Sequence, residues 1–188
     1  GTIYQLFPSK DWSGHIGAGI GNAGTGNAQD KVTIAIEIIN YGYLVERGAN
    51  LETIYSRPKE NPGRIDLYCP LTQTEAYQKL NQPFRDQKYY ASYTQQQYES
   101  LIILLRFLTK KYNIPRQFLN ESVRYQGTQD VLSFKGIVSH VNYRTGGKWD
   151  LGPAFDWQQV ITGVQAQAYQ PASGTRDALV EEDGAVTD

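Results

Sequence analysis

The sequence predicts an α/β or α+β domain in which helices flank a central mixed β-sheet. Two strand-like apolar segments, 1–8 and 32–39, and a long amphipathic helical pattern over 94–114 carry this prediction. Sheets and helices each bury an apolar face, so they pack against one another in layers. The length of 188 residues suits one such domain. We expect it to occupy residues 1–169, and we expect residues 170–188 to form a polar, acidic tail.

Composition excludes several classes of partner and site. The formal net charge of −1 gives no electrostatic reason to bind nucleic acid. No run of about 20 apolar residues is present, so we expect no membrane span. Cys69 is the single cysteine and cannot form a disulfide within the chain. The chain begins with Gly1 rather than Met, and we interpret it as processed or cut from a longer protein.

The first segments predict a strand, a loop and a second strand. Residues 1–8 are rich in β-branched and aromatic residues. The following segment, 13–30, is rich in Gly and Asn and matches G-x-G-x-x-G over residues 19–24. That motif binds a dinucleotide only where a strand precedes it and a helix follows. Because a strand-like segment follows here, we predict a flexible surface loop and no nucleotide site.

Residues 32–39 are apolar on both faces, which predicts a central strand covered on both sides. Glu37 interrupts this run, and two interpretations stay open. If Glu37 is buried, desolvation raises its pKa and suits it to general acid–base catalysis. If the sheet face opens to water there, Glu37 is an ordinary solvated carboxylate.

Residues 41–93 are polar, tyrosine-rich and interrupted by prolines. We predict a long insertion with little local structure, apart from a possible short helix over 71–80. Insertions of this length usually carry function or shape a groove.

The rest of the chain predicts helix, strand, loop and helix. Apolar residues recur at three- and four-residue spacing from Tyr98 to Tyr112, and Thr94 with Gln97 fits a capping box. A short strand, 136–140, then ends at His140. After a loop, a helix is expected to begin with Pro153 in its first turn.

The loop between these last two elements carries His140, Lys148 and Asp150. Imidazole and carboxylate are zinc ligands, and a catalytic zinc takes three protein ligands and a water. A lysine two residues before Asp150 could stabilise an oxyanion, and Glu37 could shuttle a proton. Spacing alone also fits a structural His–Asp hydrogen bond, so both interpretations stay open.

The stretch SHVNYRTGGKWDLGPAFDW, residues 139–157, resembles the signature of the zinc-dependent N-acetylmuramoyl-L-alanine amidases of the type-2 family, relatives of the peptidoglycan recognition proteins. IAIEI, residues 34–38, resembles the family's Ile-Gly-Ile-Glu strand, with Ala35 in place of Gly. WSGHIG, residues 12–17, resembles its Trp-His-x-Gly motif with two inserted residues.

The resemblance implies His140 and Asp150 as zinc ligands, Lys148 as oxyanion stabiliser and Glu37 as catalytic acid–base. It implies substrate contacts from Trp12 and His15. The expected reaction is hydrolysis of the amide between N-acetylmuramic acid and L-alanine in peptidoglycan or muropeptides. The alternative is a non-catalytic peptidoglycan-binding or structural subunit on the same fold. A cell-wall substrate favours a periplasmic or secreted location over a cytoplasmic one.

The family's first zinc histidine lies on a strand that precedes the segment matched by residues 1–8, and three explanations stay open for the missing ligand. An N-terminal fragment could remain bound as a separate chain, His15 could complete the triad, or the module could be non-catalytic. Without that earlier strand, the strand predicted over residues 1–8 would form an unpaired sheet edge. The first explanation therefore predicts that another polypeptide pairs beside residues 1–8.

Overall fold

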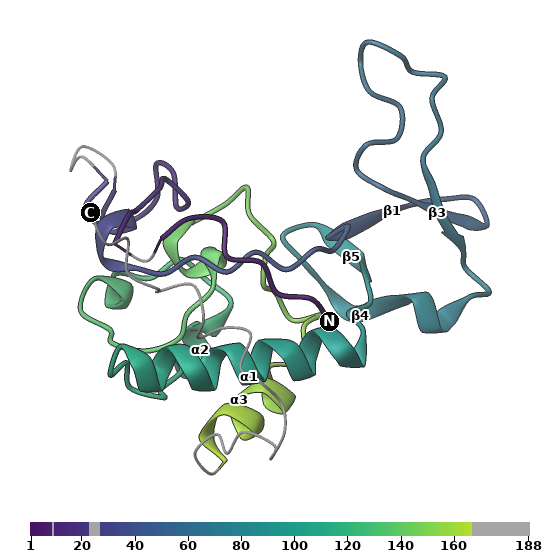
Figure 1. The fold of residues 1–188 in the computed structure, drawn as a ribbon. Helices are drawn as coiled ribbons and strands as arrows, with labels where there is room; N and C mark the ends of the chain where they lie inside the picture. Colours follow the sequence, from purple (N-terminus) through teal and green to yellow (C-terminus); the bar gives the residue numbers. More distant parts are fainter. Residues whose placement is uncertain (9, 23–26, 167–188) are drawn as a thin grey trace, which may run out of the picture.

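The computed structural model describes residues 1–8, 10–22 and 27–166, and it confirms the α+β class. A five-stranded sheet lies at one end of the molecule, and the helices and long loops lie at the other (Figure 1). The expected tail, 170–188, lies outside the described residues. Within the described ranges, no helix is both long and apolar enough to cross a membrane.

The sheet lies entirely within residues 41–93, where the sequence predicted little local structure. That prediction is wrong, as is the short helix over 71–80, of which only a 3-10 turn at Thr74–Ala76 forms. The strand order is β3-β2-β1-β5-β4, and every named pair is antiparallel, whereas the sequence predicted a mixed sheet. The strands are β1 (Tyr43–Arg47), β2 (Asn50–Glu52), β3 (Leu67–Pro70), β4 (Tyr77–Phe84) and β5 (Gln87–Ala91).

Tyrosine side chains explain how such a polar segment forms a sheet with a core of its own. The hydroxyls of Tyr68, Tyr77 and Tyr90 each donate a 2.9 Å hydrogen bond to a backbone carbonyl six or eight residues away. A tyrosine can therefore bury its ring without leaving its hydroxyl unpaired. The rings of Tyr68, Tyr77 and Tyr89 pack in one cluster with two fully buried leucines, Leu44 and Leu51.

The two segments predicted as central strands, 1–8 and 32–39, belong to no β-ladder in the described structure. They run extended, and much of their apolar surface faces solvent: Leu6 is 84% exposed and Ile39 is 86% exposed. Ile36 and Ile38 pack against the helices, so the segment is covered on one side only. Glu37 lies between them and is exposed, as in the second of the two interpretations.

The predicted strand over 136–140 reduces to one parallel bridge between Ile137 and Phe118. His140 begins a 3-10 turn, His140–Tyr143, instead of ending a strand. No neighbouring strand runs alongside this segment in the described structure, so its backbone hydrogen bonds go to turns and side chains.

The long helix is confirmed as α1 (Gln95–Lys111), with the Thr94–Gln97 capping box in place. Its buried face packs on α3 (Trp157–Gln165), and the two helices approach so closely that a Cβ at Gly163 would lie 2.6 Å from Ile102 Cδ1. Helix α3 begins later than predicted: Asp156 caps it, and Pro153 lies before the helix instead of in its first turn. A short helix, α2 (Glu121–Arg124), precedes the loop that carries His140.

Candidate functional site

The backbone of the 140–150 loop brings His140 and Asp150 together. The amide of Val141 donates to the carbonyl of Asp150 at 3.1 Å, which closes the loop at its base. Nδ1 of His140 then lies 3.3 Å from Oδ2 of Asp150. Two donors bound to one tetrahedral zinc at about 2.0–2.1 Å lie roughly 3.3–3.4 Å apart. The separation is compatible with two zinc ligands and equally with a direct ion pair between the two side chains, so both interpretations from the sequence stay open.

Asn142 fixes the turn that carries His140. Its side chain is almost fully buried, and its Oδ1 accepts the amide of Ser139 at 3.0 Å. Its Nδ2 donates to three carbonyls at and after the end of α2, the shortest bond being 2.8 Å to Arg124. A buried amide with all these bonds made holds the turn in one position. The sequence analysis did not identify this residue.

Arg85, also unidentified from the sequence, clamps the other side of the loop. Its guanidinium donates to the carbonyls of Lys148, Arg144 (2.6 Å) and Val141 (3.5 Å). The indole of Trp149 donates back to the Arg85 carbonyl at 3.0 Å. Arg85 lies at the β4–β5 turn with a positive φ of 48°, a conformation that few side chains adopt. The sheet thus supports the loop that carries the candidate ligands.

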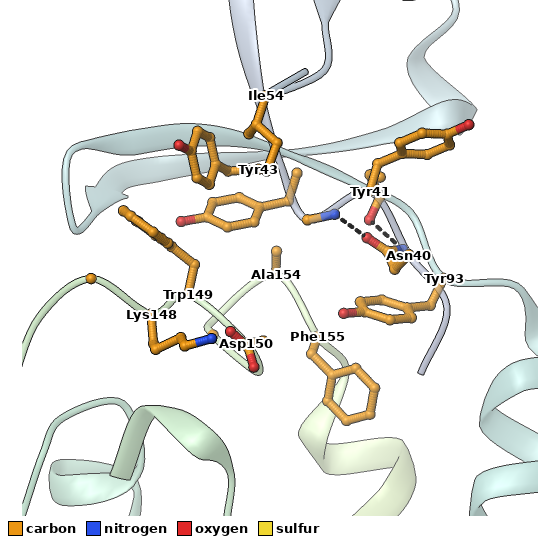
Figure 2. Close-up of a pocket in the computed structure, with 15 residues that line it drawn as sticks. Asn40, Tyr41, Tyr43, Ile54, Tyr93, Lys148, Trp149, Asp150, Ala154 and Phe155 are labelled. Carbon is orange, nitrogen blue, oxygen red and sulfur yellow. Dashed lines mark hydrogen bonds between the residues drawn. The ribbon is translucent and has the colours of Figure 1, made fainter. Parts of the chain in front are cut away.

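A cavity of about 260 Å³ opens between the sheet and this loop. Figure 2 shows Lys148 and Asp150 on one side of it and aromatic side chains around the rest. The pKa of Asp150 lies below its ordinary value. Desolvation acts to raise it, but the hydrogen bond and charge of His140, with the charge of Lys148, outweigh that effect. Asp150 is therefore held as a carboxylate, the form that binds a metal ion.

Tyr93 is a further polar group in this cavity that the sequence did not single out. Its hydroxyl points into the cavity on the side of Asp150 (Figure 2). Burial raises the pKa of Tyr93, and the nearby Tyr98, Asp150 and Glu37 raise it further. The phenol stays protonated and can donate a hydrogen bond to an anionic group.

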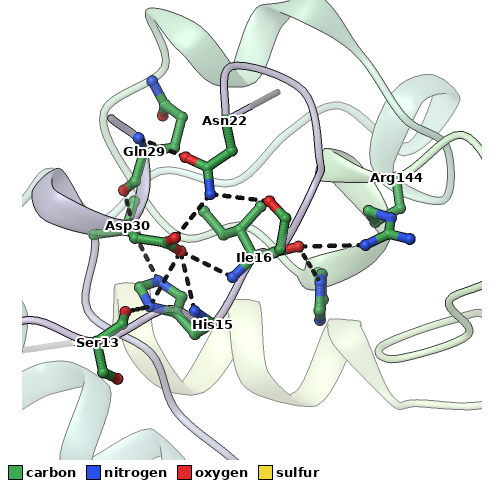
Figure 3. Close-up of polar contacts among 10 residues, drawn as sticks. Ser13, His15, Ile16, Asn22, Gln29, Asp30 and Arg144 are labelled. Atoms are coloured by element: carbon green, nitrogen blue, oxygen red, sulfur yellow. Dashed lines mark hydrogen bonds and ion pairs between the residues drawn. The ribbon is translucent and has the colours of Figure 1, made fainter. Parts of the chain in front are cut away.

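The remaining predicted site residues lie apart from this cavity. Glu37 does not line it, although its charge acts on Tyr93. Trp12 is exposed, with the Lys31 ammonium 5.0 Å from its ring. His15 is held by Ser13 O and Thr33 Oγ1, both at 2.8 Å (Figure 3). The roles assigned to these three residues stay predictions.

Across residues 1–8, 10–22 and 27–166, no three His, Cys, Asp or Glu side chains gather closely enough to hold a metal ion. His15 does not join His140 and Asp150 in this structure, so the explanation in which it completes the triad gains no support. In the described part of the chain, His140 and Asp150 lie together and no third such side chain joins them.

A comparison with protein families gives one match. The family model described as N-acetylmuramoyl-L-alanine amidase matches residues 1–153. The matched region contains both candidate zinc ligands, Lys148 and the whole sheet. No curated protein and no solved structure gave a significant match.

Proposed function

Because the chain belongs to the type-2 N-acetylmuramoyl-L-alanine amidase family, we propose that it is a zinc-dependent hydrolase of the amide between N-acetylmuramic acid and L-alanine. Peptidoglycan or its muropeptide fragments are the substrate. The observation that carries the proposal is the 3.3 Å separation of His140 Nδ1 and Asp150 Oδ2 beside a cavity that also receives Lys148. Since that substrate is cell wall, we propose a periplasmic or secreted location.

The chain's own side chains divide the chemistry among them. When bound, zinc lowers the pKa of its water to about 7 and polarises a carbonyl. His140 and Asp150 would hold the ion. As the water oxygen bonds to the amide carbon, Lys148 stabilises the charge that develops on the carbonyl oxygen, and Tyr93 adds a hydrogen bond. The carbon–nitrogen bond then breaks, and the proton released by the water goes to the departing L-alanine nitrogen. We assign this relay to Glu37 from the family resemblance alone, since Glu37 does not line the cavity.

A third ligand completes this site, and in our proposal it comes from a polypeptide segment paired beside residues 1–8. Two features of residues 1–8 support such a pairing: their apolar side chains are exposed, and they have no ladder partner in the described structure. Mass spectrometry of native material under denaturing conditions tests a separate fragment. A single species of 21.2 kDa, with no companion peptide, would contradict it.

The alternative is a module that binds peptidoglycan without cleaving it. One observation favours this alternative: the described residues provide two zinc donors and no third. The two functions differ in zinc content and in products. A metal-free, folded protein that sediments with insoluble peptidoglycan and releases no peptide would support the binding module.

The test of hydrolysis uses the full chain, zinc and a muropeptide, with mass spectrometry of the products. We expect a free peptide beginning with L-alanine. The variant Lys148→Ala should reduce turnover with zinc still bound, because it removes charge stabilisation without removing a ligand. Lys59→Ala is the control, since Lys59 is exposed on the loop between β2 and β3. Unchanged turnover in Lys148→Ala would remove Lys148 from the mechanism.

A further inference from the structure

Trp149, the residue before Asp150, lines the cavity between the sheet and the 140–150 loop. Its indole nitrogen donates to the carbonyl of Arg85 at 3.0 Å, which fixes the orientation of the ring. Tyr90, another lining residue, is held in the same way, because its hydroxyl donates to the carbonyl of Phe84 at 2.9 Å. Since the donors of both side chains are already used, they offer the cavity ring surface rather than hydrogen-bond donors.

Tyr43 completes this aromatic end of the cavity. It lies directly opposite Tyr90 in the β1–β5 pair, so the two side chains share one face of the sheet. Its ring centroid is 4.7 Å from that of Trp149, and the two planes are tilted by 52°. Figure 2 shows Tyr43 and Trp149 at one end of the cavity and Tyr93 at the other, with Asp150 between the ends. We call Tyr43, Tyr90 and Trp149 the aromatic platform.

Two glycines leave open space beside the aromatic platform. Gly42 precedes Tyr43, Gly147 lies two residues before Trp149, and both line the cavity. A Cβ atom at either glycine would have no other atom within 4 Å. Both glycines have a positive φ, of 73° and 69°, a conformation that disfavours any side chain. The cavity therefore has room for a bulky group against the platform.

The charges around the cavity indicate which group can fill this space. Among the described residues that line it, Lys148 and Asp150 carry the charges, and the aromatic platform carries none. The substrate of the proposed reaction has two arms. Its peptide arm ends in a carboxylate, which is costly to bury without a cation. Its sugar arm is neutral, because the lactyl carboxyl forms the scissile amide, and the C–H face of a sugar ring packs on aromatic rings.

We propose that Trp149 is a specificity-determining residue, and that the aromatic platform around it stacks the N-acetylmuramic acid ring of the substrate. This assignment rests on the proposed function, since it takes the two arms from that substrate. Trp149 comes from the loop that carries Asp150, whereas Tyr43 and Tyr90 come from the sheet within residues 41–93. The sheet therefore gives the site a preference for substrates that keep their sugar.

The first experiment measures binding to the metal-free full chain. One probe is the N-methylamide of N-acetylmuramic acid, which carries the sugar arm alone. The other is a lactoyl-L-alanyl peptide, which keeps the scissile amide and lacks the sugar. Nitrogen-15 NMR resolves the indole N–H signals of the three tryptophans, Trp12, Trp149 and Trp157. The spectrum of Trp149→Phe identifies the signal of Trp149.

We expect the sugar probe to shift the Trp149 signal and the peptide probe to leave it in place. A Trp149 signal that does not respond to the sugar probe would overturn the proposal. So would a signal that responds to the peptide probe as strongly as to the sugar probe, because the platform would then hold the peptide arm or neither arm selectively.

The second experiment compares kcat/KM for a muropeptide and for the lactoyl peptide with zinc present. Trp149→Ala should lower the ratio of the two values by about tenfold or more, mainly through KM of the muropeptide. Trp149→Phe keeps a ring and should give an intermediate ratio. Tyr112→Ala, an exposed aromatic at the end of α1, should keep the parent ratio. Equal losses for both substrates in Trp149→Ala would show a structural role only and overturn the proposal. If Trp149→Ala does not fold, Trp149→Phe and the NMR of the parent decide.

These readouts separate the inference from the proposed function. A Trp149 signal that responds to the sugar probe, in a protein that hydrolyses neither substrate, would contradict the function and leave the aromatic platform standing. Hydrolysis of the muropeptide with the parent ratio kept in Trp149→Ala would do the opposite.

Discussion

Nδ1 of His140 lies 3.3 Å from Oδ2 of Asp150, and the backbone bond from Val141 to the Asp150 carbonyl sets this distance. The two residues are supported from different parts of the chain. His140 is bonded to Ile16 on the N-terminal segment, and the backbone preceding Asp150 is clamped by Arg85 from the sheet. The His140–Asp150 pair therefore lies where the N-terminal segment and the sheet both contact the 140–150 loop.

Replacing Asp150 by Asn should remove most zinc binding. The amide oxygen carries no charge and is a poorer zinc ligand than the carboxylate, while the shape of the side chain is kept. Substitution of a residue that only hydrogen-bonds to a metal ligand typically lowers metal affinity by roughly 10–100-fold. We expect Asp150→Asn to lower zinc affinity by more than this. Glu60→Gln, in an exposed loop, is the matched control. Equal zinc content in both variants, measured by elemental analysis, would exclude Asp150 as a ligand.

Asp30 should make stability depend on acid pH. Burial acts to raise its pKa, but hydrogen bonds from Ile16, His15 and Asn22 outweigh this, and the pKa lies below its ordinary value. A carboxyl with a lowered folded-state pKa stabilises the fold above its unfolded pKa, about 3.9. That stabilisation is lost as pH falls through the lower folded-state value.

Urea unfolding at a series of pH values measures this dependence. Asp30→Asn should be less stable than the parent at neutral pH, and its stability should change less in the acid range. Glu60→Gln, an exposed carboxylate, should follow the parent. Parallel curves for the parent and Asp30→Asn would show that Asp30 does not contribute.

Arg85→Lys should loosen the candidate metal loop. The guanidinium donates from two nitrogens to three carbonyls, those of Lys148, Arg144 and Val141, and a single ammonium nitrogen cannot reproduce this geometry. We expect a loss of about 1–3 kcal/mol, the cost of leaving buried carbonyls unpaired. Thermal unfolding measures the loss, and hydrogen exchange of the 144–149 amides should rise. Arg64→Lys, on an exposed loop, should change neither.

Leu51→Ala should destabilise the protein by about 2–5 kcal/mol, because its side chain is fully buried in the sheet core. Leu6→Ala is the matched substitution in the segment predicted as a strand. Leu6 is largely exposed, so we expect a change within about 0.5 kcal/mol. Denaturant unfolding of both variants decides between the observed sheet and the one predicted from the sequence. A larger loss for Leu6→Ala would contradict the structure.

Tyr93→Phe should lower turnover while zinc content stays unchanged. The substitution keeps the ring that packs on Phe155 and Tyr98 and removes only the hydroxyl in the cavity. Steady-state kinetics should show the loss mainly in kcat, because the hydrogen bond strengthens as charge develops. Tyr55→Phe, at an exposed position, is the control. Identical kcat values would exclude a catalytic role for the Tyr93 hydroxyl.

The sequence was most informative where local rules decide the structure. The spacing of apolar residues and the Thr94 cap predicted α1, since both signals act within a few residues of chain. The motif around His140 predicted a pair of ligands, and the structure brings that pair together. The family that the motif resembles is the one whose model matches the chain.

The strands could not be predicted in the same way, because pairing depends on partners far along the chain. Residues 32–39 are strongly apolar, yet the described structure gives them no neighbouring strand. Residues 41–93 are polar, yet they form the sheet, and their tyrosines bury rings while the hydroxyls bond to nearby backbone carbonyls. Asp30 and Arg85 gave no signal in the sequence, since each acts through a backbone carbonyl or amide.

By itself, the sequence determined the long helix and the family, and it indicated His140, Lys148 and Asp150 as candidate site residues. Only the tertiary structure decided which strands pair, that Glu37 is exposed, and that Ile16 and Arg85 hold the candidate site. The physical reason is range. Helix periodicity and a ten-residue motif depend on residues close together in the chain. Strand pairing, and the contacts that support the candidate site residues, depend on distant backbone groups that still need a hydrogen bond.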